Sequence, residues 1–164
     1  MPKEKRQWQE REMRMLAEWL EKTYSGQHYF TRVRLGRPPE VLEGMVQDEA
    51  ERRMLKVWQR WADAVVVLPD RVIIIEAAIR SDPGDISKLE LYKALLPYTA
   101  EFTAYKHLPI ELVLLYALED AVLVKLARER DIKTIYYRPP WLSDYLDILY
   151  PRERRSPIAG QELL

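Results

Sequence analysis

Hydrophobic and polar residues follow two periods along this chain, and the two periods distinguish expected helices from expected strands. In the first expected helix, Leu16 and Leu20 belong to an apolar stripe at helical spacing, and Gly26 provides a stop. Continuous apolar, β-branched runs indicate strands farther along. In order, the pattern predicts helix 4–24, strand 28–35, helix 47–56, strands 62–68 and 72–79, a helix from Ile86, strand 110–118, helix 119–130, strand 132–137 and helix 141–150.

Turn-forming residues mark several element boundaries. The turn at 69–71 predicts a hairpin between the strands on either side of it. Asp85 is expected to be the N-cap of the helix beginning near Ile86. Pro97 is expected to kink this helix, which then resumes to about Tyr105.

The order of these elements defines a fold class. A helix between strands 72–79 and 110–118 implies a crossover connection and parallel pairing. Together with the antiparallel hairpin, this predicts an α/β fold with a mixed central sheet flanked by helices. We expect one α/β domain over residues 1–150, with an N-terminal helix, and a C-terminal tail over residues 151–164.

Composition narrows the classes of function. The chain has 164 residues, with 26 basic and 26 acidic side chains and no net charge, so any basic surface that binds a polyanion has to be local. It has no cysteine, which excludes disulfides and zinc-thiolate sites. The charged N-terminus and strand-length apolar runs predict a protein of the cytoplasm or a virion, neither secreted nor bound to a membrane.

Two acids stand out in the predicted hairpin. Asp63 opens one β-branched run and Glu76 closes the other, although a carboxylate in an apolar sheet is costly unless it is paired or binds a metal. A hairpin about the turn at 69–71 brings both acids to the same end of the sheet. They therefore predict a site for a hard divalent cation such as Mg²⁺.

Structural roles for these residues stay open beside the functional one. Asp63 is equally explained as a strand cap or as a partner of Arg60 or Arg71. Glu76 is explained as a structural ion pair with Arg80 or Lys88.

The spacing of Asp63, Glu76 and the helix that follows them resembles the PD-(D/E)xK nuclease superfamily. The RecB-like members of this superfamily add Gln-x-x-x-Tyr on that helix, and here Lys88-Leu89-Glu90-Leu91-Tyr92 keeps the tyrosine and replaces the glutamine. The resemblance covers about residues 45–118. It implies a restriction-endonuclease-like core in which Asp63 and Glu76 hold Mg²⁺.

One position departs from the family pattern. The motif lysine falls at Ala78, and in the family this lysine positions the attacking water and stabilises charge on the phosphate. Some members carry the lysine on the next helix instead, so Lys88 is the expected replacement. Arg80 is a weaker one, because a guanidinium does not deprotonate. An ordinary solvated lysine is the competing interpretation of Lys88, and a core tyrosine is that of Tyr92.

Other residues are candidates for supporting roles. Acids of the expected helix around 47–56 are candidates for a further metal ligand: Glu43, Glu49 and Glu51. Basic residues of the first strand and its continuation, beside Tyr29 and Phe30, are candidates for phosphate contact: Arg32, Arg34 and Arg37. The alternation places Tyr29, Thr31, Val33 and Leu35 on one face of the strand and Phe30, Arg32 and Arg34 on the other. Solvated charges on an edge strand are the competing interpretation.

Three functions are compatible with these residues. The first, favoured by Ala78, is a degenerate nuclease fold that serves as a structural or adaptor component among the protein subunits or identical copies of a larger assembly, such as a phage head–tail connector. The second is a Mg²⁺-dependent DNA endonuclease that uses Asp63, Glu76 and Lys88 as catalytic residues. The third is a metal-free nucleic-acid-binding module. The direction of the Lys88 side chain distinguishes the first from the second.

Overall fold

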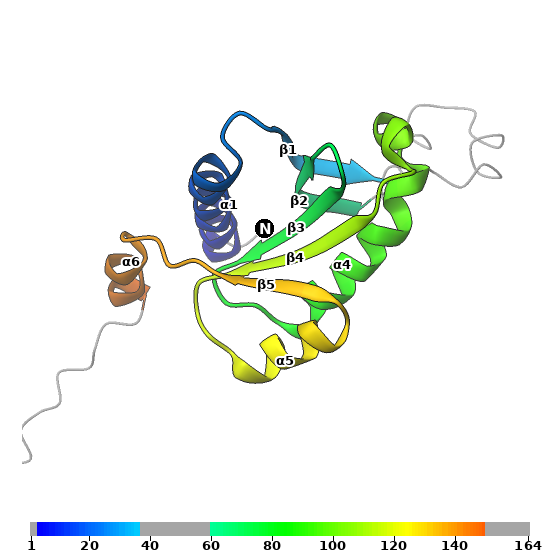
Figure 1. Cartoon of the computed structure of the whole chain (residues 1–164). Helices are drawn as coiled ribbons and strands as arrows, with labels where there is room; N and C mark the ends of the chain where they lie inside the picture. Colours follow the sequence, from blue (N-terminus) through cyan, green and yellow to red (C-terminus); the bar gives the residue numbers. More distant parts are fainter. Residues whose placement is uncertain (1–2, 37–59, 150–164) are drawn as a thin grey trace, which may run out of the picture.

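A computed structural model describes residues 3–36 and 60–149 of the chain. Within these ranges, five strands form one sheet in the order β1-β2-β3-β4-β5 (Figure 1). The strands are β1 (His28–Leu35), β2 (Arg60–Val67), β3 (Val72–Ala78), β4 (Ile110–Tyr116) and β5 (Ile132–Tyr136). The first three strands pair antiparallel and the last three pair parallel. This mixed sheet confirms the α/β class predicted from the sequence.

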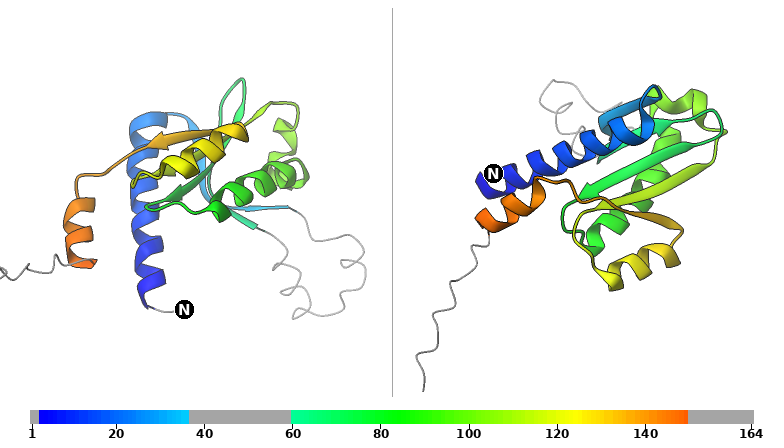
Figure 2. Two further views of the ribbon diagram at one scale, coloured as in Figure 1. Left: turned by 90° about the horizontal axis from the view of Figure 1, so that it is seen from below. Right: turned by 60° about the vertical axis from the view of Figure 1, so that its left-hand side comes forward.

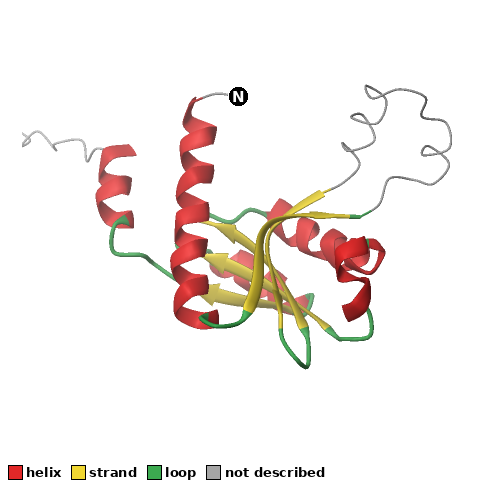
Figure 3. Ribbon diagram, turned by 90° about the horizontal axis from the view of Figure 1, so that it is seen from above, coloured by secondary structure: helices red, strands yellow, loops and turns green. Residues whose placement is uncertain are grey.

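Helices cover both faces of the sheet. Helix α1 (Lys3–Tyr24) lies on one face, and helices α4 (Pro83–Leu95) and α5 (Ala121–Glu129) lie on the other (Figure 3). Alternate residues of β3 supply the two cores, because successive side chains of a strand point to opposite faces. Ile73 and Ile75 pack on the α1 side, and Val72 and Ile74 pack on the α4 side.

Helix α4 forms the crossover between β3 and β4, as the order of elements predicts. It runs along the sheet from the end of β3 toward the short 3₁₀ helices η2 (Leu96–Tyr98) and η3 (Ala100–Tyr105) (Figure 1). Its first turn consequently lies at the end of the sheet where β3 finishes. This placement determines which α4 side chains reach the two strand acids.

Helix α6 (Leu142–Leu149) packs beside the N-terminal part of α1, where α1 runs past the ends of the strands (Figure 2). The Arg11 guanidinium lies 3.4 Å from the centre of the Tyr145 ring, and the Trp141 indole N–H donates to Glu18 at 3.0 Å. These contacts fix the part of α1 that faces the end of β3.

One of the predicted boundaries is wrong. Helix α4 begins at Pro83 with Asp82 as its N-cap, and Asp85 is instead the third helical residue of a capping box. Pro in the first turn needs no backbone N–H, so the helix begins earlier than Ile86. The break expected at Pro97 is confirmed, because α4 ends at Leu95, and the helix that resumes to Tyr105 is the 3₁₀ helix η3.

The predicted faces of β1 are also wrong. Tyr29 packs on the α1 side, whereas Val33 and Leu35 pack on the α4 side. Phe30 contacts Phe102 on the α4 side, so it does not share a face with Arg32. The physical reason is Arg32, whose φ of 52° lies in the left-handed region and interrupts the alternation.

The predicted helix 47–56 and tail 151–164 lie outside the described residues, as do Arg37, Glu43, Glu49 and Glu51. Among the helices that the structure does describe, none has the length and apolar content needed to cross a membrane.

Candidate active site

The two strand acids meet where β2 and β3 separate. The register of this pair ends at Ala64 opposite Ile75, and beyond it carboxylates accept the hydrogen bonds of β3. The N–H of Ala77 donates to Asp63 Oδ2 at 2.8 Å, and the N–H of Ile79 donates to Glu12 Oε1 of α1 at 3.2 Å. Asp63 and Glu12 are therefore held in place by the end of one strand.

Glu76 lies on the same segment of β3 and meets Lys88 of α4. The Lys88 ammonium donates to Glu76 Oε1 at 2.7 Å and to Asp85 Oδ1 at 2.8 Å. The carboxylates of Glu76 and Asp85 are only 6% and 7% exposed, whereas the lysine side chain is half exposed. The lysine thus points to the acids while its stem borders solvent.

The first turn of α4 fixes the position of this lysine. Asp82 Oδ1 accepts from the N–H of Gly84 at 2.6 Å, and Asp85 Oδ2 accepts from the N–H of Asp82 at 2.9 Å. Asp85 therefore both closes the capping box and binds Lys88 with its second oxygen. The cap ties the direction of Lys88 to the beginning of the helix.

A cavity of about 380 Å³ opens over these groups. It lies between the N-terminal part of α1, the end of β3 and the first turns of α4. Its lining residues are Gln9, Glu12, Asp63, Glu76, Ala77, Ala78, Arg80, Asp82, Asp85 and Lys88. Ala78 belongs to this wall, so the position that carries the family lysine and its expected replacement face the same space.

Three acids of the cavity, Glu12, Asp63 and Glu76, retain protons more strongly than ordinary carboxyl groups. Burial raises the pKa of Glu76 to about 8, and the charge of Asp63 adds to this effect. Burial likewise raises the pKa of Glu12 to about 7, against the hydrogen bond from Ile79, and it raises the pKa of Asp63. Carboxylates crowded in this way favour the binding of a cation.

Two neighbours of Glu76 respond to its charge. Burial lowers the pKa of Lys88, but the hydrogen bonds to Asp85 and Glu76 outweigh it, so its pKa lies above the usual range. Lys88 therefore stays protonated at neutral pH. Tyr92 is buried in the α4-side core, as its competing interpretation predicts, and burial together with the charge of Glu76 raises the pKa of its phenol.

The donor set fits a hard divalent cation in part. In the ranges 3–36 and 60–149, no three His, Asp or Glu side chains are arranged to hold one metal ion. Magnesium, however, commonly uses one or two carboxylates and completes its shell with water and phosphate oxygens. Glu76 Oε2 is buried and accepts no hydrogen bond from the residues that the structure describes, so it is available for this role. Asp63 and Glu76 are the residues that would hold such an ion.

The structure brings most of the predicted residues together and adds one. Asp63, Glu76, Lys88 and Arg80 line one cavity, and Arg71 contacts Asp70 and Glu111. Glu12 was not predicted, although a signal was present. It lies four residues before Leu16, so a charged side chain interrupts the apolar stripe of the helix.

Comparisons of the chain with protein-family models, with curated proteins and with solved structures find no match. The resemblance to the PD-(D/E)xK superfamily therefore stays a prediction, and the function has to be argued from the geometry of the cavity.

Proposed function

We propose that this protein is a metal-dependent nuclease of the PD-(D/E)xK type, in which Asp63 and Glu76 are the ligand carboxylates. The observation that carries this proposal is the Lys88 ammonium 2.7 Å from Glu76 Oε1, in the cavity that also contains Ala78 and Asp63. A helix-borne lysine supplies the cation that the strand lacks. DNA is the expected substrate, and Mg²⁺ the expected ion.

The residues of the chain have separate roles in phosphodiester hydrolysis. In this reaction a water oxygen bonds to phosphorus and releases a proton to solvent, the P–O bond to the leaving sugar oxygen breaks, and that oxygen takes up a proton from solvent. A divalent ion, when bound, lowers the pKa of water and neutralises phosphate charge. Lys88 is protonated, so it donates hydrogen bonds to the water or to a phosphate oxygen and does not act as a base. Asp85 positions Lys88, because it accepts a hydrogen bond from the same ammonium.

The structural or adaptor role in an assembly, with protein subunits or identical copies as partners, stays a competing prediction. One feature of the site favours it: Lys88 already bridges two buried carboxylates, as an inert ion pair would. The two functions differ in an observable way. An inert scaffold does not require a metal and does not cleave DNA. A nuclease of this type requires a metal and cleaves DNA.

The deciding experiment is the cleavage of single-stranded and duplex DNA in Mg²⁺ or Mn²⁺, with Asp63→Asn and Glu76→Gln as test variants. Both variants keep the shape of the carboxylate and remove its charge. A suitable control is Glu111→Gln, because Glu111 is a strand acid opposite Ile73, near the other end of β3. We expect wild type and control to cleave and both test variants to lose activity by about 100-fold or more. Absence of cleavage by wild type in either metal would favour the scaffold.

A further inference from the structure

The cavity of about 380 Å³ around Asp63, Glu76 and Lys88 is called the acidic cavity below. A second cavity, of about 310 Å³, adjoins it, because Gln9 and Asp63 line both. Its other walls come from Met13 of α1, Arg32 of β1, and Trp61 and Ala62 of β2. This space places a cation and an aromatic ring directly beside one of the ligand carboxylates. The hydrolytic roles described above make no use of either residue.

Trp61 has the properties of a stacking surface. Its side chain is a large apolar group with 52% of its surface exposed, although it borders a cavity. The guanidinium carbon of Arg34 lies 4.6 Å from the centre of its ring, in the geometry of a cation–π contact. The indole is therefore held in position by Arg34 while it lines the cavity. Aromatic rings presented in this way stack on nucleobases irrespective of sequence.

Arg32 supplies the positive charge of the same cavity. Its backbone has a φ of 52°, a conformation that residues other than glycine rarely adopt. The resulting change of face turns Arg32 away from Phe30 and toward the α1 side, where it lines the cavity with Gln9 and Met13. Asp63 lines this cavity as well, so a phosphate bound beside Asp63 would lie near the Arg32 guanidinium.

We propose that this second cavity binds an unpaired nucleotide next to the phosphodiester that occupies the acidic cavity, with its base on Trp61 and its phosphate near Arg32. The proposal rests on the proposed nuclease function and narrows its substrate to single-stranded nucleic acid or to single-stranded segments. The reason is steric: in a duplex each base is stacked between neighbours, so its face meets an indole only after it leaves the stack.

Binding of short oligonucleotides tests the proposal without catalysis. Fluorescence anisotropy in EDTA would compare single-stranded DNA, single-stranded RNA and blunt duplex DNA of about ten nucleotides, a length that covers one binding site. We expect at least one of the two single-stranded oligonucleotides, DNA or RNA, to bind about tenfold more tightly than the duplex. Trp61→Ala should lose about tenfold of this affinity, and Trp61→Phe should keep most of it. Arg32→Gln should weaken binding and reduce the slope of its salt dependence by about one.

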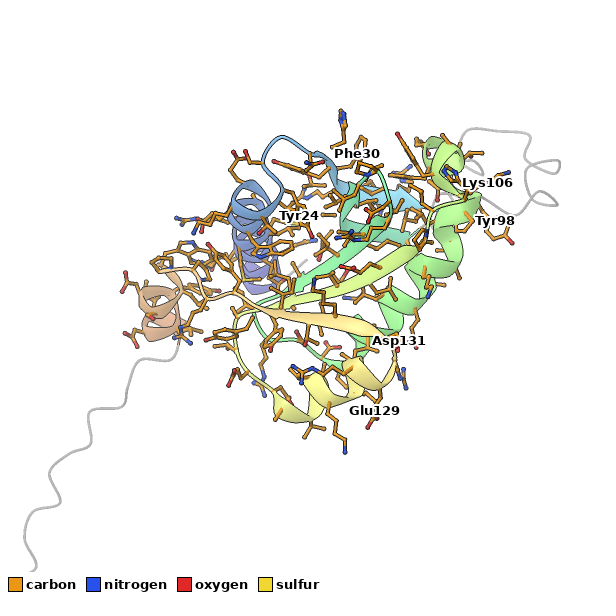
Figure 4. All side chains as sticks on the ribbon, in the orientation of Figure 1. Tyr24, Phe30, Tyr98, Lys106, Glu129 and Asp131 are labelled. Carbon is orange, nitrogen blue, oxygen red and sulfur yellow. The ribbon has the colours of Figure 1, made fainter. Side chains whose placement is uncertain are left out.

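Matched controls lie on other parts of the molecule. Tyr98 is 65% exposed at the opposite end of α4 (Figure 4), so Tyr98→Ala removes an exposed ring far from the cavity. Arg128→Gln removes an exposed arginine from α5, on the other face of the sheet. Both controls should bind as wild type does. Equal affinity for duplex and single strands, or unchanged binding by Trp61→Ala, would overturn the proposal.

A substrate without a base separates this proposal from the nuclease function. Metal-dependent hydrolysis of bis(p-nitrophenyl) phosphate needs the acidic cavity but no stacking surface. We expect Glu76→Gln to lose it and Trp61→Ala to keep it. Failure of wild type to hydrolyse this ester would contradict the nuclease function, while the nucleotide cavity would still be judged by oligonucleotide binding. Equal loss in Trp61→Ala would show a general defect of the site and overturn the proposed role of Trp61.

Discussion

At residue 78 the nuclease pattern requires a lysine on β3, and this chain has an alanine there. Ala78 forms part of the wall of the acidic cavity, and Lys88 of α4 lines the same cavity from the neighbouring helix. The chemical requirement is an ammonium beside the strand carboxylates. Either the strand or the neighbouring helix is able to supply it. A lysine on either element therefore meets the requirement, provided that its ammonium reaches Glu76.

This argument predicts a rescue between two positions. Lys88→Ala should lower the rate of DNA cleavage by about 100-fold or more, because it removes the one ammonium bound to Glu76 in the described residues. Adding Ala78→Lys to this variant should restore part of the rate, because residue 78 faces the same cavity. The measurement is the cleavage rate of each variant under saturating metal.

The control for this pair is Lys93→Ala, which removes an exposed lysine from the same helix. It should cleave as wild type does. If Lys88→Ala keeps the full rate, the lysine is structural and the relocation is wrong. If the double variant folds but gains nothing over Lys88→Ala, the ammonium is needed in the α4 geometry specifically.

Individual residues also show the limit of what the sequence predicts. Asp63 and Glu76 were identifiable because a carboxylate in or next to an apolar run needs a partner, and Lys88 because the family resemblance implies a lysine on the helix that follows. Glu12 was missed because it lies 51 residues before Asp63, and only the folded sheet brings the two together. The left-handed backbone of Arg32 was also missed, since no glycine or asparagine marks it.

At the scale of elements, the strands and the crossover were predictable because burial on two faces demands continuous apolar runs. The ends of helices were less so, because several residues near Pro83 are able to cap. Asp82 and Asp85 both have suitable side chains, and the capping box uses them reciprocally. The cap matters for function, since it defines where Lys88 lies on the helix.

Removal of the α4 cap should therefore affect both stability and activity. Asp82→Ala leaves the N–H of Gly84 without its side-chain acceptor and should lower the free energy of unfolding by about 1 kcal/mol. It should also lower the cleavage rate, because Asp85 and Lys88 lose the geometry that the cap imposes. Urea unfolding and cleavage assays on the same variant measure the two effects.

Helix α5 offers a matched control for this prediction. Asp120 caps it through hydrogen bonds from the N–H groups of Val122 and Leu123, and this helix contributes no residue to the acidic cavity. Asp120→Ala should lose a similar free energy of unfolding and retain activity. Equal losses of activity in both variants would mean that stability alone controls the rate, and the positioning role of the α4 cap would be wrong.

At the scale of the whole molecule, net neutrality conceals an uneven distribution of charge. The 26 basic and 26 acidic residues cancel, yet the described part of the chain places Glu12, Asp63, Glu76 and Asp85 around Lys88 in one cavity. Folding without a metal brings these carboxylates together, and their mutual repulsion and burial act against the folded state. The molecule therefore lowers its stability locally to assemble this acidic cavity, as functional sites commonly do.

The stability lost by burying these carboxylates depends on pH. The pKa values of Glu12 and Glu76 are about 7 and about 8 in the folded protein, and both lie near 4.5 in the unfolded chain. Between pH 4.5 and 8 the folded state therefore binds more protons than the unfolded state, so stability falls as pH rises. In EDTA, we expect the raised pKa of Glu12 alone to lower the free energy of unfolding by roughly 2 kcal/mol between pH 5.5 and 8.5, which corresponds to about 5 °C in the melting temperature. The raised pKa of Glu76 acts in the same direction and adds to this fall.

Thermal unfolding followed by circular dichroism at the two pH values measures this effect. Glu12→Gln should flatten the dependence, because the amide oxygen still accepts from the N–H of Ile79 but does not ionise. Glu101→Gln, at an exposed position in η3, should leave the dependence unchanged. At pH 8.5, Mg²⁺ should recover stability in wild type, because an ion that binds only the folded state stabilises it by mass action. Stability that rises with pH in EDTA would show that these acids are ionised and paired, and a lysine-neutralised scaffold would then explain the site better than a metal centre.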